Sequence, residues 1–221
     1  MDNKEAFRIF YETFTGDLPP YLEKIREEAE NEGIPVIRRS EEGILSFFAS
    51  MKPDADILEL GTAVGFSALL LWEASGKRSR ITTIENYEPR IIKAEENIRA
   101  AGADKHIDLR KGDATDILKE LKGGYDLVFM DAAKGQYETW LKDIIPLLNE
   151  GAFLISDNIL KESEIMSPRY AVKRRDRTIH TRMRSYLRCL FEDERFDTIL
   201  IENGDGMAVS RYKGIKPVKD K

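Results

Sequence analysis

Acidic side chains stand where several apolar segments of the sequence end. These residues are Glu59, Glu85, Asp113, Asp131 and Asp157, the last of them followed by Asn158. If the segments are parallel strands, their carboxyl ends share one edge of a sheet, which is where open α/β folds bind their ligands. The repeated placement of carboxylates therefore indicates a functional edge rather than a set of solvated loops.

One of these acids has a basic neighbour. In MDAAKGQY (130–137), Asp131 follows the apolar run DLVFM, and Lys134 stands three residues later. A solvated, charged loop is the plain interpretation of such a pair. A catalytic edge is the alternative, since a carboxylate and an ammonium group are suited to moving protons. The SDN segment (156–158) at the next strand end favours the catalytic interpretation.

Alternating strands and helices must position these residues. Apolar runs and turn signals predict strands over 55–61, 79–85, 106–113, 125–131, 152–158, 196–202 and 206–212. Helical spacing predicts helices over 6–14, 22–30, from Ser40 onward as N-cap, 62–74, 89–102, 114–124 and 137–148. The expected fold is α/β, with a seven-stranded, mostly parallel sheet, an antiparallel edge hairpin and helices on both faces. One domain is expected over 1–221, with a helical N-terminal cap (1–50), an α/β core (55–212) and a basic insertion or helix (168–190).

Composition excludes several classes of protein. The 221 residues carry a net charge of −5, contain one cysteine, Cys189, and lack an apolar run long enough to span a bilayer. An intramolecular disulfide and a cysteine-based zinc site are excluded, a signal peptide is not indicated, and a cytoplasmic location is expected. The charge is segregated, because residues 168–188 hold eight Lys or Arg and one acid. Such a segment favours an anionic partner.

The turn after the first strand, ELGTAVGFS (59–67), is glycine-rich but lacks the G-x-G-x-x-G pattern that cradles a pyrophosphate. Gly61 and Gly65 allow the backbone to approach a ligand, although a tight strand-to-helix turn alone would also use them. Glu85 can accept hydrogen bonds from ribose hydroxyls, and Asn86 can flank an adenine. Asp113 and the following alanine can hold the adenine edge. S-adenosylmethionine fits this pattern better than NAD does.

The segments ELGTAVGFS, MDAAKGQY and SDN, together with Glu85, resemble the class I metal-dependent O-methyltransferases, which include catechol and caffeoyl-CoA O-methyltransferases. The resemblance covers nearly the whole chain and implies a Rossmann-like methyltransferase fold with extra N-terminal helices. It implies that Asp131, Asp157 and Asn158 bind Mg²⁺ and that Lys134 and Asp131 are catalytic. The cofactor-binding residues that it implies are Val36, Ile37, Glu59, Gly61, Thr62, Gly65, Ser67, Glu85, Asn86, Asp113, Ala114 and Asp131.

These residues suit the implied chemistry. Mg²⁺ prefers six oxygen ligands, of which the protein would supply three and a substrate with two adjacent oxygens would supply two. Lys134 can then take the proton of the hydroxyl or stabilise its oxyanion. The sequence departs from the catechol enzymes at Ala132 and Ala133, where those enzymes carry His-Trp.

The substrate must carry a hydroxyl beside a second oxygen, which describes both catechols and 5-hydroxyuracil. The basic segment favours the second, since Lys and Arg bind phosphates. This segment and MDAAKGQY are similar to the bacterial tRNA 5-hydroxyuridine methyltransferases, which make 5-methoxyuridine at the wobble position. That resemblance implies a homodimer and an anticodon stem-loop as the partner. The expected RNA-binding residues are Arg174, Arg175, Arg177, Arg182 and Arg184.

Three alternatives remain open from the sequence. A small-molecule O-methyltransferase for catechol-like phenols would not need the arginines. An RNA-binding module with a relic methyltransferase fold is disfavoured, because Asp131, Lys134, Asp157 and Asn158 are all present. A NAD-dependent oxidoreductase is disfavoured by the missing pyrophosphate loop.

Overall fold

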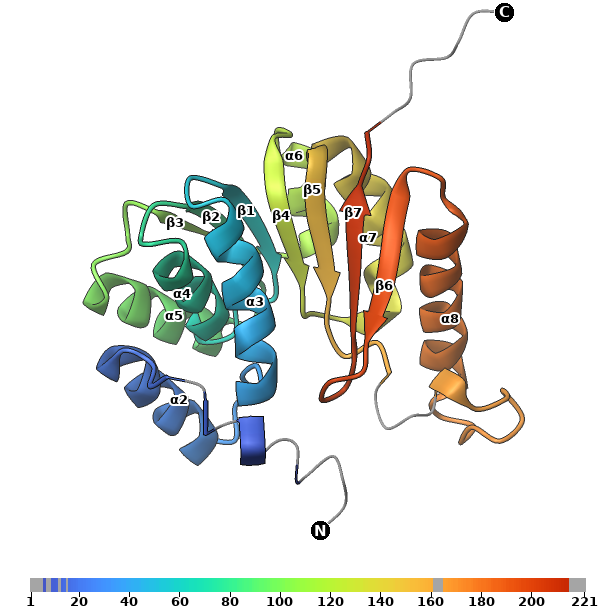
Figure 1. Ribbon diagram of the computed structural model, residues 1–221, viewed down its shortest axis with the longest axis horizontal. Helices are drawn as coiled ribbons and strands as arrows, with labels where there is room; N and C mark the ends of the chain where they lie inside the picture. The colour runs from blue at the N-terminus through green and yellow to red at the C-terminus, as the bar shows by residue number, and fades with distance from the viewer. Residues whose placement is uncertain (1–5, 7–8, 12, 15, 161–164, 215–221) are drawn as a thin grey trace, which may run out of the picture. The chain divides into compact units, whose positions relative to one another are not determined.

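The computed structural model describes residues 6, 9–11, 13–14, 16–160 and 165–214 (Figure 1). The chain forms two compact units. The first unit comprises residues 1–55 and 62–111, and the second comprises 56–61 and 112–221. Of the expected helix over 6–14, residues 6 and 9–11 are helical and residues 13–14 form a turn, while 7, 8 and 12 lie outside the described residues.

The first unit holds the helices α2 to α5 and two strands. Their bounds are α2 Pro20–Asn31, α3 Arg39–Met51, α4 Phe66–Ala74, β2 Arg80–Glu85, α5 Glu88–Ala100 and β3 Ile107–Lys111. Helix α4 is apolar on all sides, and six of its nine residues are buried, as expected for a helix packed between other elements. The strands β2 and β3 pair in parallel, so their carboxyl ends face the same way.

The second unit holds the other five strands and three α-helices. Their bounds are β1 Asp56–Leu60, α6 Ala114–Glu120, β4 Tyr125–Met130, α7 Tyr137–Ile144, β5 Leu148–Ser156, α8 Arg177–Glu192, β6 Phe196–Ile201 and β7 Met207–Tyr212, with 3-10 turns η1 Lys134–Gln136 and η2 Ile145–Leu147. Strands β1, β4 and β5 are parallel, and the β6–β7 hairpin (red in Figure 1) joins β5 through an antiparallel β7. Because β4 and β5 are parallel neighbours, the residues that follow them meet at one edge.

The strand order β3-β2-β1-β4-β5-β7-β6 confirms the expected fold. It is a seven-stranded mixed sheet with an antiparallel hairpin at one edge and helices around it. The core strands are nearly continuous apolar runs, as in sheets covered on both faces. In β4, for example, the last four residues, Leu127, Val128, Phe129 and Met130, are buried.

Several predicted boundaries are wrong; the helix predicted over 62–74, for example, begins only at Phe66, because Gly65 before it has a left-handed conformation. Helix α3 begins at Arg39, so Ser40 is not its N-cap; instead the Glu41 carboxylate accepts a hydrogen bond from the backbone N–H of Arg38 at 3.3 Å. Strand β5 begins at Leu148, where a helix was expected to end, because Pro146 cannot extend the helical hydrogen bonding of α7.

The basic segment, expected as an insertion or a helix over 168–190, is helical only from Arg177 onward, where α8 begins. Residues 168–176 form turns instead, and side chains of α8 donate hydrogen bonds to their carbonyl oxygens. These local bonds replace those that a longer helix would make.

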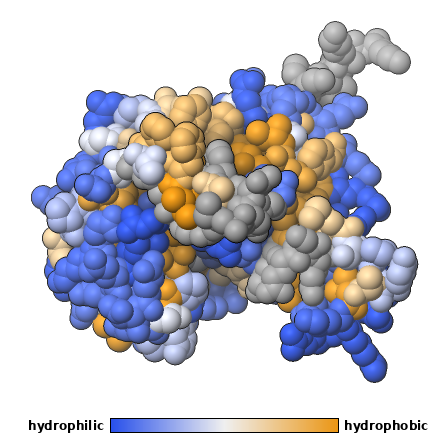
Figure 2. Space-filling model, turned by 60° about the horizontal axis from the view of Figure 1, so that its bottom comes forward, coloured by the Kyte–Doolittle hydropathy of each residue, from blue (hydrophilic) through white to orange (hydrophobic). Residues whose placement is uncertain are grey.

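Several large apolar side chains stay exposed. They include Phe47 (63% exposed) and Met51 (57%) on α3, and Ile199 (58%) on the edge strand β6. Figure 2 shows apolar residues (orange) gathered in patches among the hydrophilic residues (blue) of the face that it displays. None of the described helices is long and apolar enough to cross a membrane.

Candidate active site

The ends of β4 and β5 bring the three predicted metal ligands together. Asp131 follows β4, and its backbone N–H donates to Leu60 O at 3.0 Å, while the N–H of Asp157 donates to Met130 O at 2.9 Å. The ladder hydrogen bonds thus continue one residue beyond the strands and fix both carboxylates at the same edge. Asn158 adopts a left-handed conformation (φ 60°), in which asparagine is better tolerated than most residues.

The Asn158 amide lies between the two carboxylates. Its Nδ2 donates to Asp131 Oδ1 at 3.0 Å and to Asp157 Oδ2 at 2.9 Å. Asp157 is almost fully buried, with 2% of its surface exposed. Burial raises the pKa of the Asp131 carboxyl above its ordinary value, while the charge of Lys134 and the hydrogen bond from Asn158 act in the opposite direction. Two acids in so small a space call for a positive charge beside them.

This donor set fits Mg²⁺. The described residues contain no group of three or more His, Cys, Asp or Glu placed to hold a metal, so a metal ion here would need the amide oxygen as its third protein ligand. A half-turn of the Asn158 amide exchanges its nitrogen and oxygen, after which the oxygen faces both carboxylates. That arrangement is stable only with a cation between the three groups, and three oxygen ligands with room for water suit Mg²⁺.

Glycine is required where the first strand passes this edge. Gly61 has φ 101°, and a Cβ placed on it would lie 2.2 Å from Asp131 O and 2.9 Å from Asp131 C. Its predicted role was the approach of a cofactor, and the structure gives it a second role, since only glycine lets the end of β4 come so close. Gly61 thereby helps to set the position of Asp131.

A buried tyrosine forms hydrogen bonds with the backbone at the same edge. The Tyr137 hydroxyl donates to Met130 O at 3.0 Å and accepts from the backbone N–H of Ala132 at 3.3 Å. Asp157 O lies 3.5 Å from it. Burial raises the pKa of this hydroxyl well above its ordinary value, with the nearby Asp131 adding to the effect, so it stays protonated. Sequence reasoning missed this role, although Tyr137 ends the MDAAKGQY motif.

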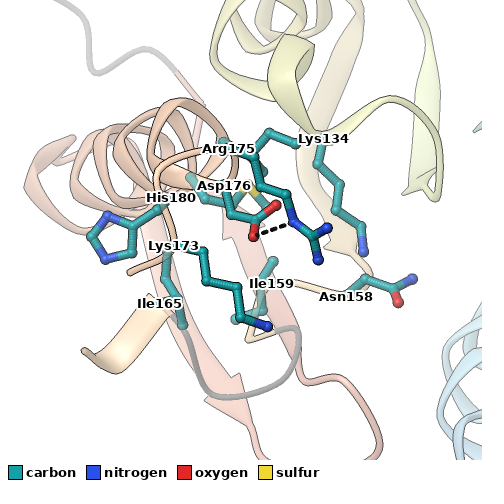
Figure 3. A pocket seen from close by; sticks show the side chains of 10 residues that line it. Lys134, Asn158, Ile159, Ile165, Lys173, Arg175, Asp176 and His180 are labelled. Carbon is teal, nitrogen blue, oxygen red and sulfur yellow. Dashed lines mark hydrogen bonds and ion pairs between the residues drawn. The ribbon is translucent and has the colours of Figure 1, made fainter. Parts of the chain in front are cut away.

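A cavity of about 210 Å³ opens beside Lys134 and Asn158 (Figure 3). The described residues that line it are Lys134, Asn158, Ile159, Ile165, Lys173, Arg175, Asp176, Ile179, His180 and Met183. Lys134 and Arg175 extend into the same space from different elements, η1 and the segment before α8. The cavity therefore joins the predicted catalytic lysine to the basic segment.

The five predicted RNA-binding arginines fall into two groups. Arg174 and Arg175 are exposed on the segment before α8. The other three donate to backbone carbonyls: Arg177 to Val172 (2.9 Å), Arg182 to Gly135 (3.1 Å) and Arg184 to Ile165 (2.9 Å). Their contact with RNA stays a prediction, and their bonds within the protein are an additional function that the charge pattern could not show.

Several predicted cofactor residues lie in the first unit, where Glu85 forms a compact site. Its carboxylate accepts hydrogen bonds from three backbone N–H groups, those of Ala63 (2.9 Å), Asn86 (3.0 Å) and Tyr87 (3.0 Å). The turn that carries Ala63 is closed by a bond from Gly65 N to Thr62 O at 2.8 Å. These bonds orient the carboxylate and leave lone pairs for further donors.

The other predicted cofactor residues of the first unit lie apart in sequence. Gly65 is the N-cap of α4, with φ 84°, and Ser67 lies in the first turn of that helix. Ile37 is buried, and its carbonyl accepts from Arg26 Nη2 at 3.0 Å, while Val36 beside it is half-buried. The Arg26 guanidinium also stacks over the Phe66 ring at 4.4 Å, which ties this segment to α4.

In the second unit, Glu59 lies in β1 and is fully buried. Asp113 caps α6, since its Oδ1 accepts from Thr115 N at 2.8 Å, and Ala114 begins that helix. The hydrogen bonds from Thr115 hold the pKa of the Asp113 carboxyl below its ordinary value. A capping role explains Asp113 by itself, so its contact with a cofactor stays a prediction.

Comparison with known proteins places the chain in a family. A family model described as O-methyltransferase matches residues 12–213. Catechol O-methyltransferase from Niastella koreensis is 31% identical over 141 residues, covering 61% of this chain and 63% of that protein. Catechol O-methyltransferase from Mycobacterium tuberculosis is 34% identical, covering 50% and 51% respectively. The matches thus span between about half and just under two thirds of these relatives' own length.

Solved structures share the fold over nearly the whole chain. The methyltransferase PaMTH1 from Podospora anserina, bound to SAH, has a TM-score of 0.85 and 24% identity, with 97% of each chain covered. TomG from Streptomyces achromogenes, in complex with SAM, has a TM-score of 0.83 and 21% identity, with 97% of this chain and 100% of that chain covered. By its match to the family model over most of its length, the chain belongs to the O-methyltransferase family.

Proposed function

We propose that the protein is an S-adenosylmethionine- and Mg²⁺-dependent O-methyltransferase that converts 5-hydroxyuridine at the tRNA wobble position to 5-methoxyuridine. One observation carries the proposal. The cavity beside Lys134 and Asn158 is also lined by Lys173 and Arg175, so groups that act on a hydroxyl and groups that attract phosphate face the same space.

The cofactor is supported by the fold neighbours and by Glu85. PaMTH1 and TomG hold SAH and SAM respectively. S-adenosylmethionine, when bound, supplies the methyl group from its sulfonium centre. Three backbone N–H groups orient the Glu85 carboxylate, which can then accept hydrogen bonds from the two ribose hydroxyls. That role accounts for a buried acid at a strand end.

The residues after β4 and β5 supply the acid–base chemistry. Asp131, Asp157 and Asn158 would hold Mg²⁺, which lowers the pKa of a hydroxyl bound to it and fixes that oxygen. The Lys134 ammonium group extends into the cavity. In its neutral form, Lys134 Nζ can accept the hydroxyl proton, and in its charged form it can stabilise the resulting oxyanion.

The shape and charge of the site favour 5-hydroxyuracil as the substrate base. In 5-hydroxyuracil, the hydroxyl stands beside the C4 carbonyl, which provides the two adjacent oxygens that a metal would bind. Ala132 and Ala133 replace the bulky residues of the catechol enzymes and leave room for a base turned out of an anticodon loop. The exposed Arg174, which does not line the cavity, extends the positive surface beyond it. A homodimer and a cytoplasmic location form part of the proposal.

A catechol-like phenol is the second candidate substrate. The curated relatives from N. koreensis and M. tuberculosis, at 31% and 34% identity, both carry the name catechol O-methyltransferase. A small neutral phenol would fill a cavity of about 210 Å³, but it would bring no anionic group for Lys173 and Arg175 to bind.

Nucleoside mass spectrometry of tRNA tests the proposal. In cells that lack this gene, we expect 5-methoxyuridine to fall and 5-hydroxyuridine to rise by a matching amount. Re-expression of the wild-type chain should restore the first nucleoside, whereas the Asp157→Ala variant should not. Unchanged 5-methoxyuridine, without a rise in 5-hydroxyuridine, would show that tRNA is not the substrate.

A further inference from the structure

We propose that Lys173 and Arg175 form a phosphate subsite that holds the phosphate flanking the hydroxylated base, while the catalytic groups hold the base itself. This inference rests on the proposed function and makes it more specific. It separates two residues of the basic segment from the arginines around them and assigns them a ligand.

The cavity has a different chemistry at its two ends. Lys134 and Asn158 lie at the end nearest the strand edge, and Lys173 and Arg175 come from the segment before α8 (Figure 3). Apolar side chains line the cavity as well, namely Ile159, Ile165, Ile179 and Met183. A ligand that fits all of this carries a flat, partly apolar ring with a hydroxyl, and an anionic group attached to it.

The charges of the lining favour an anion. Among the described lining residues, Lys134, Lys173 and Arg175 are cationic, and Asp176 is the one acid. Asp176 Oδ2 accepts a hydrogen bond from Arg175 Nε at 3.3 Å, which leaves the outer edge of the guanidinium fork directed away from that carboxylate. One acid cannot balance three cations, so the described part of the lining carries a net positive charge.

The segment that carries these two cations is fastened to α8. Arg177 donates to Val172 O at 2.9 Å and to Tyr170 O at 3.3 Å. His180 Nε2 lies 2.9 Å from Ser167 O, and Arg184 donates to Ile165 O at 2.9 Å. These bonds hold the main chain that precedes Lys173, and the buried Val172 (3% exposed) packs beneath it.

Fixed main chain matters because lysine and arginine side chains lose much conformational entropy when they are held by a ligand. The bonds from α8 fix the main chain before Lys173, so a ligand has to order mainly the two side chains and not the backbone as well. Arginine can hold two phosphate oxygens in a fork and lysine acts as a compact charge, so together they suit a phosphate better than a single carboxylate.

Equilibrium binding tests the subsite without relying on turnover. Uridine and uridine 5′-monophosphate would be titrated by calorimetry into the full chain saturated with SAH, at constant ionic strength. We expect the monophosphate to bind the wild-type chain roughly tenfold or more tightly than the nucleoside, as for a charged hydrogen bond to phosphate. The double variant Lys173→Ala/Arg175→Ala should reduce this ratio to about one.

Arg174→Ala is the matched control. Arg174 lies between the two residues and is exposed, but it does not line the cavity, so its removal should leave the ratio unchanged. A wild-type ratio near one would overturn the subsite, and so would a ratio that survives the double substitution. A fall of equal size in Arg174→Ala would show a diffuse charge effect and would also overturn it. Melting curves confirm that each variant is folded.

A methylation assay distinguishes failure of the phosphate subsite from failure of the proposed function. 5-Hydroxyuridine and its 5′-monophosphate would be assayed with labelled S-adenosylmethionine. Equal KM values with clear methylation would refute the subsite and keep the function. A short anticodon hairpin that contains 5-hydroxyuridine would be tested in the same assay. Tighter binding of the monophosphate, without methylation of either compound or of the hairpin, would refute the function and keep the subsite, assigned then to another phosphate-bearing substrate.

Discussion

Substitution of Gly61 by alanine tests how the sheet edge positions Asp131. The added Cβ would lie 2.2 Å from Asp131 O, which is backbone and cannot rotate away. A positive φ costs a non-glycine residue about 1–2 kcal/mol, and forcing an extra carbon into a packed region costs about 1–3 kcal/mol more. The expected loss is thus about 2–5 kcal/mol in the free energy of unfolding.

Displacement of Asp131 should also impair catalysis. A misplacement of about 1 Å at a reacting group can lower the rate by roughly a hundredfold. Thermal unfolding followed by circular dichroism measures the first effect, and initial rates at saturating S-adenosylmethionine measure the second. With a shift of roughly 2–4 °C per kcal/mol for a chain of this size, the melting temperature should fall by about 10 °C.

Gly76→Ala is the control for the backbone conformation alone. Gly76 also has a positive φ (67°), but nothing lies within 4 Å of a Cβ placed on it. We expect a loss of about 1 kcal/mol and unchanged activity. If Gly61→Ala behaves like Gly76→Ala in both stability and rate, the close approach of Gly61 to the Asp131 backbone does not set the position of Asp131.

Three further substitutions test the site. Tyr137→Phe leaves the Ala132 N–H without its acceptor, so it should lower the free energy of unfolding by about 1–3 kcal/mol and weaken Mg²⁺ affinity in calorimetry. Tyr186→Phe, at an equally buried tyrosine, should destabilise the protein without changing that affinity. An equal loss of metal binding in both variants would contradict the positioning role. Asp131→Ala should abolish Mg²⁺-stimulated methyl transfer in a folded protein, and wild-type activity that persists in excess chelator would refute the metal mechanism. Lys134→Ala should lower kcat far more than the affinity for S-adenosylmethionine, with a changed pH profile; equal losses of both would argue against a base.

The sequence predicted the order of elements well because their patterns are local. Seven apolar segments separated by turns became the seven strands of the sheet. The errors fall where a local signal competes with a tertiary one. Leu148 joins β5 as the partner of Tyr125, and the Asn149 side chain donates to Gly124 O at 2.9 Å. The residues around 148 do not by themselves predict these partners.

The candidate site was predicted in part for the same reason. Strand-end positions placed Asp131, Asp157 and Asn158 at one edge, and the structure brings their side chains within hydrogen-bond distance. The roles of Tyr137 and Arg182 depend instead on backbone carbonyls that the fold brings to them, those of Met130 and Gly135. A count of basic residues treats all arginines alike, whereas the structure separates those that hold the main chain from those that line the cavity.

Methyl transfer by the purified chain to two substrates in parallel tests the central claim most directly. The substrates are tRNA that contains 5-hydroxyuridine and catechol, each with labelled S-adenosylmethionine, with and without Mg²⁺. We expect Mg²⁺-dependent labelling of the tRNA, with a kcat/KM roughly a hundredfold or more above that for catechol, since several phosphate contacts add to binding. Catechol methylated as efficiently as the tRNA, or tRNA left unlabelled, would contradict the proposed function.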